Sequence, residues 1–371
     1  MKKARIAVVA LAVLMLFAAV SCKDEPVHQH VFDKQVVEEK YLAEKATEES
    51  PAKYYLSCEC GEKSEETFKY GDPLPPAHKH SYSTEWKSNA DNHWHVCECG
   101  AKTDEEKHTL EVDKDGTNHW KKCSVCGYKT EGVAHVYGAP QVKGDKVVHV
   151  CEECAREEEI KGAVAVGTED ALFAAVKNGV RDVYLSKDII LKKTLFIDGD
   201  KEITLHMNDK KIAIDVTETT GGLITVVGNA KLTVTGNGRF TYTEEYYNTD
   251  LTLTGYFFTV KNDAQLTILD GNYDGVMGCI QIGSDKTIVE KASVFIKGGS
   301  FKSVVLYSGH YWTLNKIDGT SASFVVSGGE FASFDPSNGK TENPPENFLA
   351  EGYKTTSKDV DGITWWTVEK N

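Results

Sequence analysis

Positive charge is scarce in this chain. It has 42 Lys and Arg residues against 56 Asp and Glu residues, which gives a formal net charge of −14. Without the cations at Lys2, Lys3 and Arg5, the net charge becomes −14 − 3 = −17. Nucleic acids and anionic lipid surfaces are bound by clustered positive charge. The charge balance therefore predicts that nucleic acid is not a partner.

Long hydrophobic runs are also missing, with one exception at the N-terminus. The basic residues at positions 2–5 precede an apolar run from Ile6 to Val20, which ends in Ala19-Val20-Ser21-Cys22. This run is short for a membrane span but has the architecture of an export signal, so residues 1–21 are predicted to be a signal peptide. No second run of membrane length follows, and we expect the rest of the chain to be soluble apart from an anchor.

The small residues before Cys22 resemble a bacterial lipobox, in which the cysteine becomes the lipidated first residue of the mature protein. This resemblance implies lipidation of Cys22, a linker over 22–27, and attachment to the membrane at the bacterial cell surface. Ordinary signal cleavage with an unmodified Cys22 is the alternative.

Residues 28–161 lack apolar runs that could form a core. Instead they carry four copies of one pattern, an opening histidine followed by a cysteine pair, over 28–71, 78–107, 108–134 and 135–161. A short polar segment needs a cross-link or a metal in place of a core. The repeated residues are His30, Cys58, Cys60; His80, Cys97, Cys99; His108, Cys123, Cys126; and His135, Cys151, Cys154.

We favour structural zinc as the group that holds each repeat together. Cys-x-x-Cys near a histidine is typical of a zinc knuckle, a disulfide across Cys-x-Cys is strained, and histidines have no role in a disulfide. The export signal favours disulfides, however, and a redox dithiol also stays open. We predict that each pair binds zinc with its opening histidine and a varying fourth ligand. The candidates are His93, His95, His119, His149 or the opening histidine of the next copy.

The array resembles a family of histidine- and cysteine-rich, zinc-ribbon-like repeats in surface proteins of anaerobic bacteria. The matching text is His80-Ser-Tyr-Ser, Trp86, the segment from His93 to Gly100, and His135-Val-Tyr137. The resemblance implies a cell-surface module.

Residues 163–371 have a different repeat. Short strands alternate apolar and polar residues, turn on glycine, and bring an aromatic anchor every 33, 28 and 30 residues, at Phe240, Tyr273, Phe301 and Phe331. Repetition at this interval predicts a mainly β solenoid, a parallel β-helix in which inward side chains stack from coil to coil. A helix over 168–179, capped by Thr168, is predicted to cover the first coil.

Two segments, 183–208 and 329–368, resemble the entry and the closing segment of right-handed parallel β-helices of the pectin-lyase-like superfamily. The resemblance implies that fold for 163–371, with a C-terminal closing segment. It implies little about activity, because one fold hosts many functions.

Catalytic residues are sparse, and no enzyme is predicted. The paired carboxylates of a glycosidase are missing. Asp263, Asp270 and Asp274 near Arg239 are candidate calcium ligands of a lyase-type site, although turn aspartates are the simpler interpretation. Aromatic residues of the longer loops are candidates for stacking on sugar rings. They include Tyr246, Tyr247, Tyr311 and Trp312.

These features predict an exported surface lipoprotein that presents a β-helix on a metal-clipped stalk. Its predicted role is binding, in adhesion or in recognition of a glycan or of a protein on a host or neighbouring cell. A carbohydrate-active enzyme, either a polysaccharide lyase or a glycosidase, is one alternative. A structural spacer without a ligand is the other.

Overall fold

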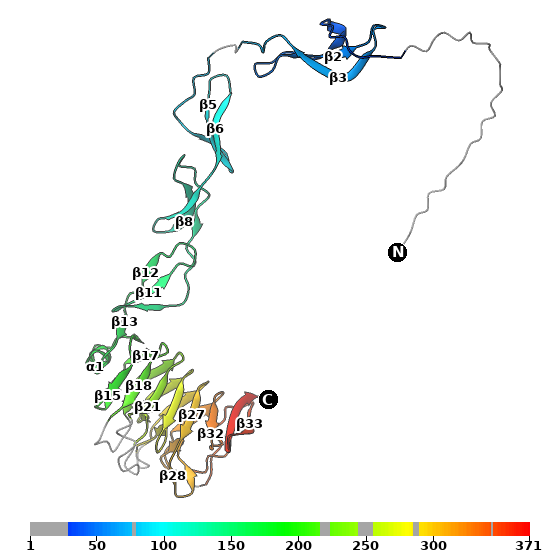
Figure 1. Ribbon diagram of the computed structural model, residues 1–371. Helices are drawn as coiled ribbons and strands as arrows, with labels where there is room; N and C mark the ends of the chain where they lie inside the picture. The colour runs from blue at the N-terminus through cyan, green and yellow to red at the C-terminus, as the bar shows by residue number, and fades with distance from the viewer. Residues whose placement is uncertain (1–28, 76–78, 216–222, 244–254, 285–288, 343) are drawn as a thin grey trace, which may run out of the picture. The chain divides into compact units, whose positions relative to one another are not determined.

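A computed structural model describes residues 29–75, 79–215, 223–243, 255–284, 289–342 and 344–371 (Figure 1). The predicted signal peptide, Cys22, Tyr246 and Tyr247 lie outside these residues. The chain is mainly β and divides into two compact units, residues 1–108 and 109–371. Within the described ranges, no helix has the length and apolar character that crossing a membrane requires.

The first unit contains two small antiparallel sheets, each formed by one copy of the His/Cys pattern. A short 3-10 helix, η1 (Glu39–Tyr41), precedes the first sheet, and each cysteine pair lies in the turn after a central strand. The first sheet consists of β1 (Leu42–Glu44), β2 (Ala52–Ser57) and β3 (Lys63–Tyr70). The second consists of β4 (Lys87–Ser88), β5 (Asn92–Val96) and β6 (Lys102–Lys107).

The second unit begins with the other two copies, which fold as the same kind of sheet. The third copy forms β7 (Leu110–Lys114), β8 (Asn118–Cys123) and β9 (Val133–Ala134). The fourth forms β10 (Gln141–Lys143), β11 (Lys146–Val150) and β12 (Glu157–Glu159). The sequence repeat therefore corresponds to a repeated structural element.

Three sheets with parallel strands follow, and the chain visits them in turn. The first is β13 (Ala163–Val166), β14 (Asp182–Leu185), β17 (Glu202–His206), β20 (Lys231–Thr235), β23 (Gln265–Ile268), β26 (Ser293–Ile296) and β31 (Ser323–Val326). The second is β15 (Ile189–Leu191), β18 (Lys211–Ile214), β21 (Arg239–Tyr242), β24 (Asn272–Gly275), β27 (Ser300–Ser303) and β32 (Glu330–Ala332). The third is β16 (Leu195–Ile197), β19 (Ile224–Val226), β22 (Phe258–Val260), β25 (Ile280–Ile282) and β30 (Leu314–Lys316).

The register of the second sheet confirms the predicted spacing of the aromatic anchors. Phe240, Tyr273, Phe301 and Phe331 pair directly with one another along four neighbouring strands. Their ring centroids are 5.3, 4.7 and 4.9 Å apart, and all four side chains are buried. Cys279 is also buried, as predicted for a small inward residue. One continuous core therefore runs between the sheets.

Both ends of this core are covered. The predicted helix is present as α1 (Glu169–Lys177), where the Thr168 side chain accepts a hydrogen bond from the Ala171 N–H. Its buried face packs beside β13, β15 and β16. At the other end, β33 (Tyr353–Val360) and β34 (Ile363–Lys370) form a hairpin whose second strand pairs antiparallel with β32.

Candidate metal centres

The cysteine turns share one backbone geometry. The residue after each second cysteine donates its N–H to the carbonyl of the first cysteine, over 2.8–3.0 Å. That residue has a left-handed φ in all four copies: 95° at Gly61, 90° at Gly100, 75° at Gly127 and 52° at Ala155. The pattern explains the glycine that follows three of the pairs. Ala155 is exposed and adopts the same turn at a cost of roughly 1–2 kcal/mol.

A cluster with four donors lies within the second unit. His119, His135, Cys151 and Cys154 each offer a ligand atom, and these four atoms all lie within 4.8 Å of one another. Both cysteines are buried and both histidines are half-buried. His119 comes from β8 of the third copy, whereas the other three residues belong to the fourth. His119 is therefore the candidate fourth ligand that lies in the cluster of the fourth copy.

The imidazole rings are oriented as metal ligands require. His135 places Nε2 3.1 Å from the Asp115 carbonyl oxygen and Nδ1 3.4 Å from Cys154 Sγ. A proton on Nε2 that is donated to the carbonyl leaves the Nδ1 lone pair for a metal. His119 Nδ1 is buried, and no hydrogen-bond partner for it occurs among the described residues. A bound cation would satisfy this nitrogen, so the donor set fits a tetrahedral Cys₂His₂ zinc site.

The charge state of Cys151 suits the same role. Burial favours the neutral thiol, but the Cys154 and Glu153 backbone amides and the His135 side chain stabilise the thiolate more strongly. The balance lowers the pKa of Cys151 from 9.0 to about 6. Near neutral pH this sulfur is therefore largely the thiolate that binds metal.

The first unit holds two clusters with three donors each: His30 with Cys58 and Cys60, and His80 with Cys97 and Cys99. In both, histidine Nδ1 lies beside the second sulfur, at 3.1 Å from Cys60 and 3.2 Å from Cys99. His80 Nε2 lies 3.9 Å from a carboxylate oxygen of Glu48. The Glu48 carboxylate is thus near this nitrogen, but farther away than the Asp115 carbonyl oxygen is from His135 Nε2.

The opening histidine of the third copy lies in the first unit, and its cysteine pair lies in the second. His108 ends the first unit, and its Nδ1 lies 3.3 Å from Nδ1 of His93. His108 Nε2 lies 3.0 Å from the Asn89 carbonyl oxygen. This arrangement repeats that of His119 and His135. Cys123 is fully buried in the second unit, and Cys126 is half-buried there.

His95 and His149 lie outside these clusters. His95 Nδ1 is 3.3 Å from the Glu85 carbonyl oxygen, and the ring stacks on Trp86 at 3.8 Å. His149 Nδ1 is 2.9 Å from the Gly138 carbonyl oxygen. Both rings therefore contact backbone carbonyl oxygens and are not grouped with the cysteine sulfurs.

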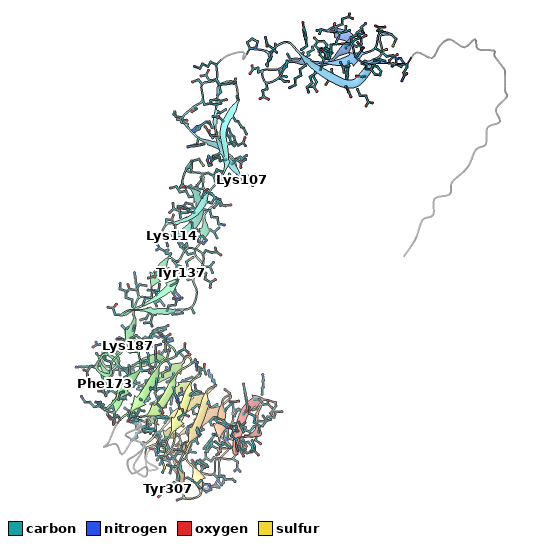
Figure 2. The ribbon with its side chains drawn as sticks, in the orientation of Figure 1. Lys107, Lys114, Tyr137, Phe173, Lys187 and Tyr307 are labelled. Carbon is teal, nitrogen blue, oxygen red and sulfur yellow. The ribbon has the colours of Figure 1, made fainter. Side chains whose placement is uncertain are left out.

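Two features of the sites were missed from the sequence. One is an aromatic residue two positions after the opening histidine, which contacts that ring at 5.7–5.8 Å. These residues are Phe32, Tyr82 and Tyr137, the last labelled in Figure 2. The other is the Asn or Asp that begins the turn before the central strand, Asn89 and Asp115, whose carbonyl faces the next opening histidine. An Asx residue four positions before each His-Trp dipeptide was a readable signal.

The acidic residues considered for calcium serve turns and an ion pair. Asp263 and Asp270 accept backbone N–H groups from Lys291 and Gly271, and Asp274 lies 2.6 Å from the Arg239 guanidinium. In the part of the chain that the structure describes, they do not form a metal-binding group.

The two described loop aromatics have different environments. Tyr311 lines a cavity of about 430 Å³. The Trp312 indole N–H donates to the Tyr307 carbonyl oxygen at 3.0 Å.

Comparison of the chain with protein-family models, curated proteins and solved structures found no significant match.

Replacing His119 with alanine is expected to weaken zinc binding at the fourth copy by more than ~100-fold, because even the outer partners of zinc ligands contribute about 10- to 100-fold. The measurement is the zinc concentration that protects Cys151 and Cys154 from alkylation in the reduced full chain, read by mass spectrometry.

His149→Ala is the matched control, because it removes a half-buried ring whose Nδ1 faces a backbone carbonyl. It should change protection by no more than about 3-fold, less than the net contribution of one hydrogen bond. Equal effects of the two substitutions would exclude His119 as a ligand.

Proposed function

We propose that this chain is an exported, lipid-anchored surface protein in which zinc-clipped repeats carry a right-handed parallel β-helix that binds glycans or proteins. The observation that carries the proposal is the four-donor cluster of His119, His135, Cys151 and Cys154. A metal ion in this cluster would cross-link the repeats, which supports a structural role for the array. Recognition of a ligand is then the role of the region with the three parallel sheets.

Zinc is preferred over a disulfide for three reasons. Histidine Nδ1 atoms face the sulfurs, one buried imidazole nitrogen needs a partner, and thiolate with imidazole is a donor set that zinc favours. None of the nine described cysteines is joined in a disulfide. Because His119 comes from the preceding copy, one ion would join the third and fourth repeats.

The β-helix proposal is supported by strand order and register. Successive strands enter the three sheets in turn, and every pair between β13 and β32 within these sheets is parallel. Parallel strands joined in this way nearly always have right-handed connections. The covering elements at both ends suit a stack whose first and last strands would otherwise expose unpaired edges.

Attachment through Cys22 is tested by phase partition of the chain produced in a bacterial host. The unsubstituted protein is expected in the detergent phase, and Cys22→Ala in the aqueous phase, because the acyl chains supply the membrane affinity. Intact cells should also expose the protein to added protease. Identical partition of both forms would contradict the anchor.

Binding is tested on arrays of glycans and of surface proteins with the zinc-loaded mature chain. Retention without released product supports recognition. Released oligosaccharides would instead favour a polysaccharide lyase or glycosidase, and absence of both would favour a spacer.

A further inference from the structure

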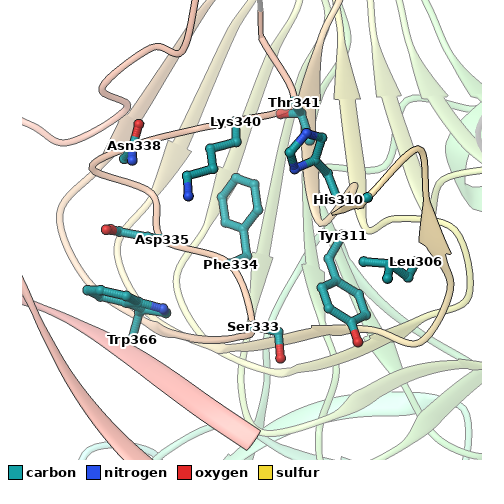
Figure 3. Close-up of a pocket in the computed structure, with 11 residues that line it drawn as sticks. Leu306, His310, Tyr311, Ser333, Phe334, Asp335, Asn338, Lys340, Thr341 and Trp366 are labelled. Atoms are coloured by element: carbon teal, nitrogen blue, oxygen red, sulfur yellow. The ribbon is translucent and has the colours of Figure 1, made fainter.

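A cavity of about 430 Å³ lies near the C-terminal end of the second unit (Figure 3). It is lined by the hairpin of β28 (Leu306–Tyr307) and β29 (His310–Tyr311), by the segment after β32, and by β34. Its volume falls within the roughly 300–1,000 Å³ typical of small-ligand sites.

Two aromatic side chains line opposite sides of this cavity, Tyr311 from β29 and Trp366 from β34 (Figure 3). Trp366 is fixed by strand pairing with Phe331 and Ser357, and it packs against the core. Both side chains are partly buried, and neither ring stacks on another ring among the residues that the structure describes. The part of each ring that lines the cavity can contact the apolar face of a sugar ring.

The charged groups of the cavity favour an anionic ligand. Lys340 is exposed and has no carboxylate within ion-pair distance in the described ranges, whereas Lys316 nearby is paired with Glu346 at 2.7 Å. His310 adds a ring N–H that can donate a hydrogen bond to an anion. Asp335 is the single acidic residue of the lining, and its Oδ1 already accepts bonds from Ser337 and Thr355. Lys340 is therefore the charged group of the lining that is left to pair with a ligand, because Asp335 is held by bonds within its own region.

The wall of the cavity also contains strained backbone. Ser333 lines it with a φ of 55°, a left-handed conformation held by its N–H bond to the Thr364 carbonyl at 2.7 Å. Non-glycine residues in this conformation cluster at binding and catalytic sites.

We propose that this cavity binds a terminal sugar residue that bears a carboxylate. The ring would stack against Trp366 or Tyr311, the carboxylate would pair with Lys340 and accept a hydrogen bond from the His310 ring, and Asn338 would bond to hydroxyl groups. A neutral sugar leaves the Lys340 ammonium group unpaired, and a simple anion leaves the aromatic side chains uncovered. The small volume favours the end of a glycan chain. A single acidic residue, already bonded within its loop, does not form the carboxyl pair of a glycosidase, so we expect binding without cleavage. This inference rests on the proposed glycan-binding function.

The test is calorimetric titration of the zinc-loaded mature chain with the methyl glycosides of N-acetylneuraminic acid and of glucuronic acid. Methyl glucoside and acetate are the neutral-sugar and bare-anion comparisons. An acidic glycoside should bind about 10-fold or more tightly than the neutral one, as expected for a hydrogen bond to a charged group. Lys340→Gln should abolish that preference, and Tyr311→Ala should weaken the binding of every sugar by about 3- to 10-fold.

Two matched substitutions lie outside the cavity lining. Tyr307→Ala removes an exposed aromatic side chain from the same hairpin, and Lys358→Gln removes an exposed lysine of β33. Both should leave affinity unchanged. Equal affinity for acidic and neutral glycosides, acetate binding as tight as the acidic sugar, or no effect of Lys340→Gln would overturn the assignment of this cavity. Glycan retention that survives Lys340→Gln leaves the proposed function standing, whereas a chain that retains neither glycans nor proteins contradicts both.

Discussion

Removal of the proposed zinc ions with EDTA under reducing conditions is expected to unfold the four repeats and to leave the parallel sheets folded. The repeats bury few apolar side chains: in β3 and β6 every residue but three is exposed. The sheets beyond β13 share a continuous apolar core and need no ion. Structural zinc contributes about 10–16 kcal/mol in small metal-folded domains, which is more than such repeats obtain from burial.

The measurement is limited proteolysis mapped by mass spectrometry, with circular dichroism on the same sample. New cleavage should appear within residues 29–161 and be reversed by added zinc. EDTA could remove the metal while the thiols stay reduced and residues 29–161 remain resistant to protease. That result would show that zinc does not hold the repeats together. A magnesium-saturated EDTA sample with excess zinc serves as the control for chelator effects.

Phe301→Ala is expected to lower the free energy of unfolding of the parallel-sheet region by about 3–5 kcal/mol, the range for removing a large buried aromatic side chain. Phe301 is fully buried, and its ring stacks between Tyr273 at 4.7 Å and Phe331 at 4.9 Å. The space left by the Phe301 ring would interrupt the row of stacked aromatic anchors at its centre. Urea unfolding followed by far-ultraviolet circular dichroism provides the value.

Phe196→Ala is the matched control, because Phe196 lies at the centre of β16 with 57% of its side chain exposed. Its removal should change the free energy of unfolding by less than about 0.5 kcal/mol, as is usual for surface positions. Similar losses for both substitutions would mean that the aromatic row is not the core of the stack.

The fold was largely predictable because its signals are local and repeated. The aromatic anchors recur at nearly constant spacing, and parallel stacking places equivalent residues in register, so Phe240 and Tyr273 pair as predicted. The helix at 169–177 was predictable from its capping threonine and apolar face. The mainly β class and the parallel sheets are confirmed.

The fourth ligand could not be selected from the sequence, because it comes from a different copy. His119 reaches His135 because β8 pairs antiparallel with β9, which ends one residue before His135. His93 and His95 differ by two positions and would share a face of an ideal strand. A shift of register between them separates their environments, so His93 meets His108 and His95 meets Trp86. The cavity was equally hidden, since its walls come from segments more than 20 residues apart.

The contribution of His119 by the third copy to the cluster of the fourth copy affects how such arrays can change in length. The cluster in the fourth copy contains His119 of the third copy, so the fourth copy alone does not hold all four donors. Duplication of a whole repeat then adds a complete donor set, whereas a deletion that begins within a repeat leaves an incomplete donor set. We expect natural length variants of this region to differ by whole repeats.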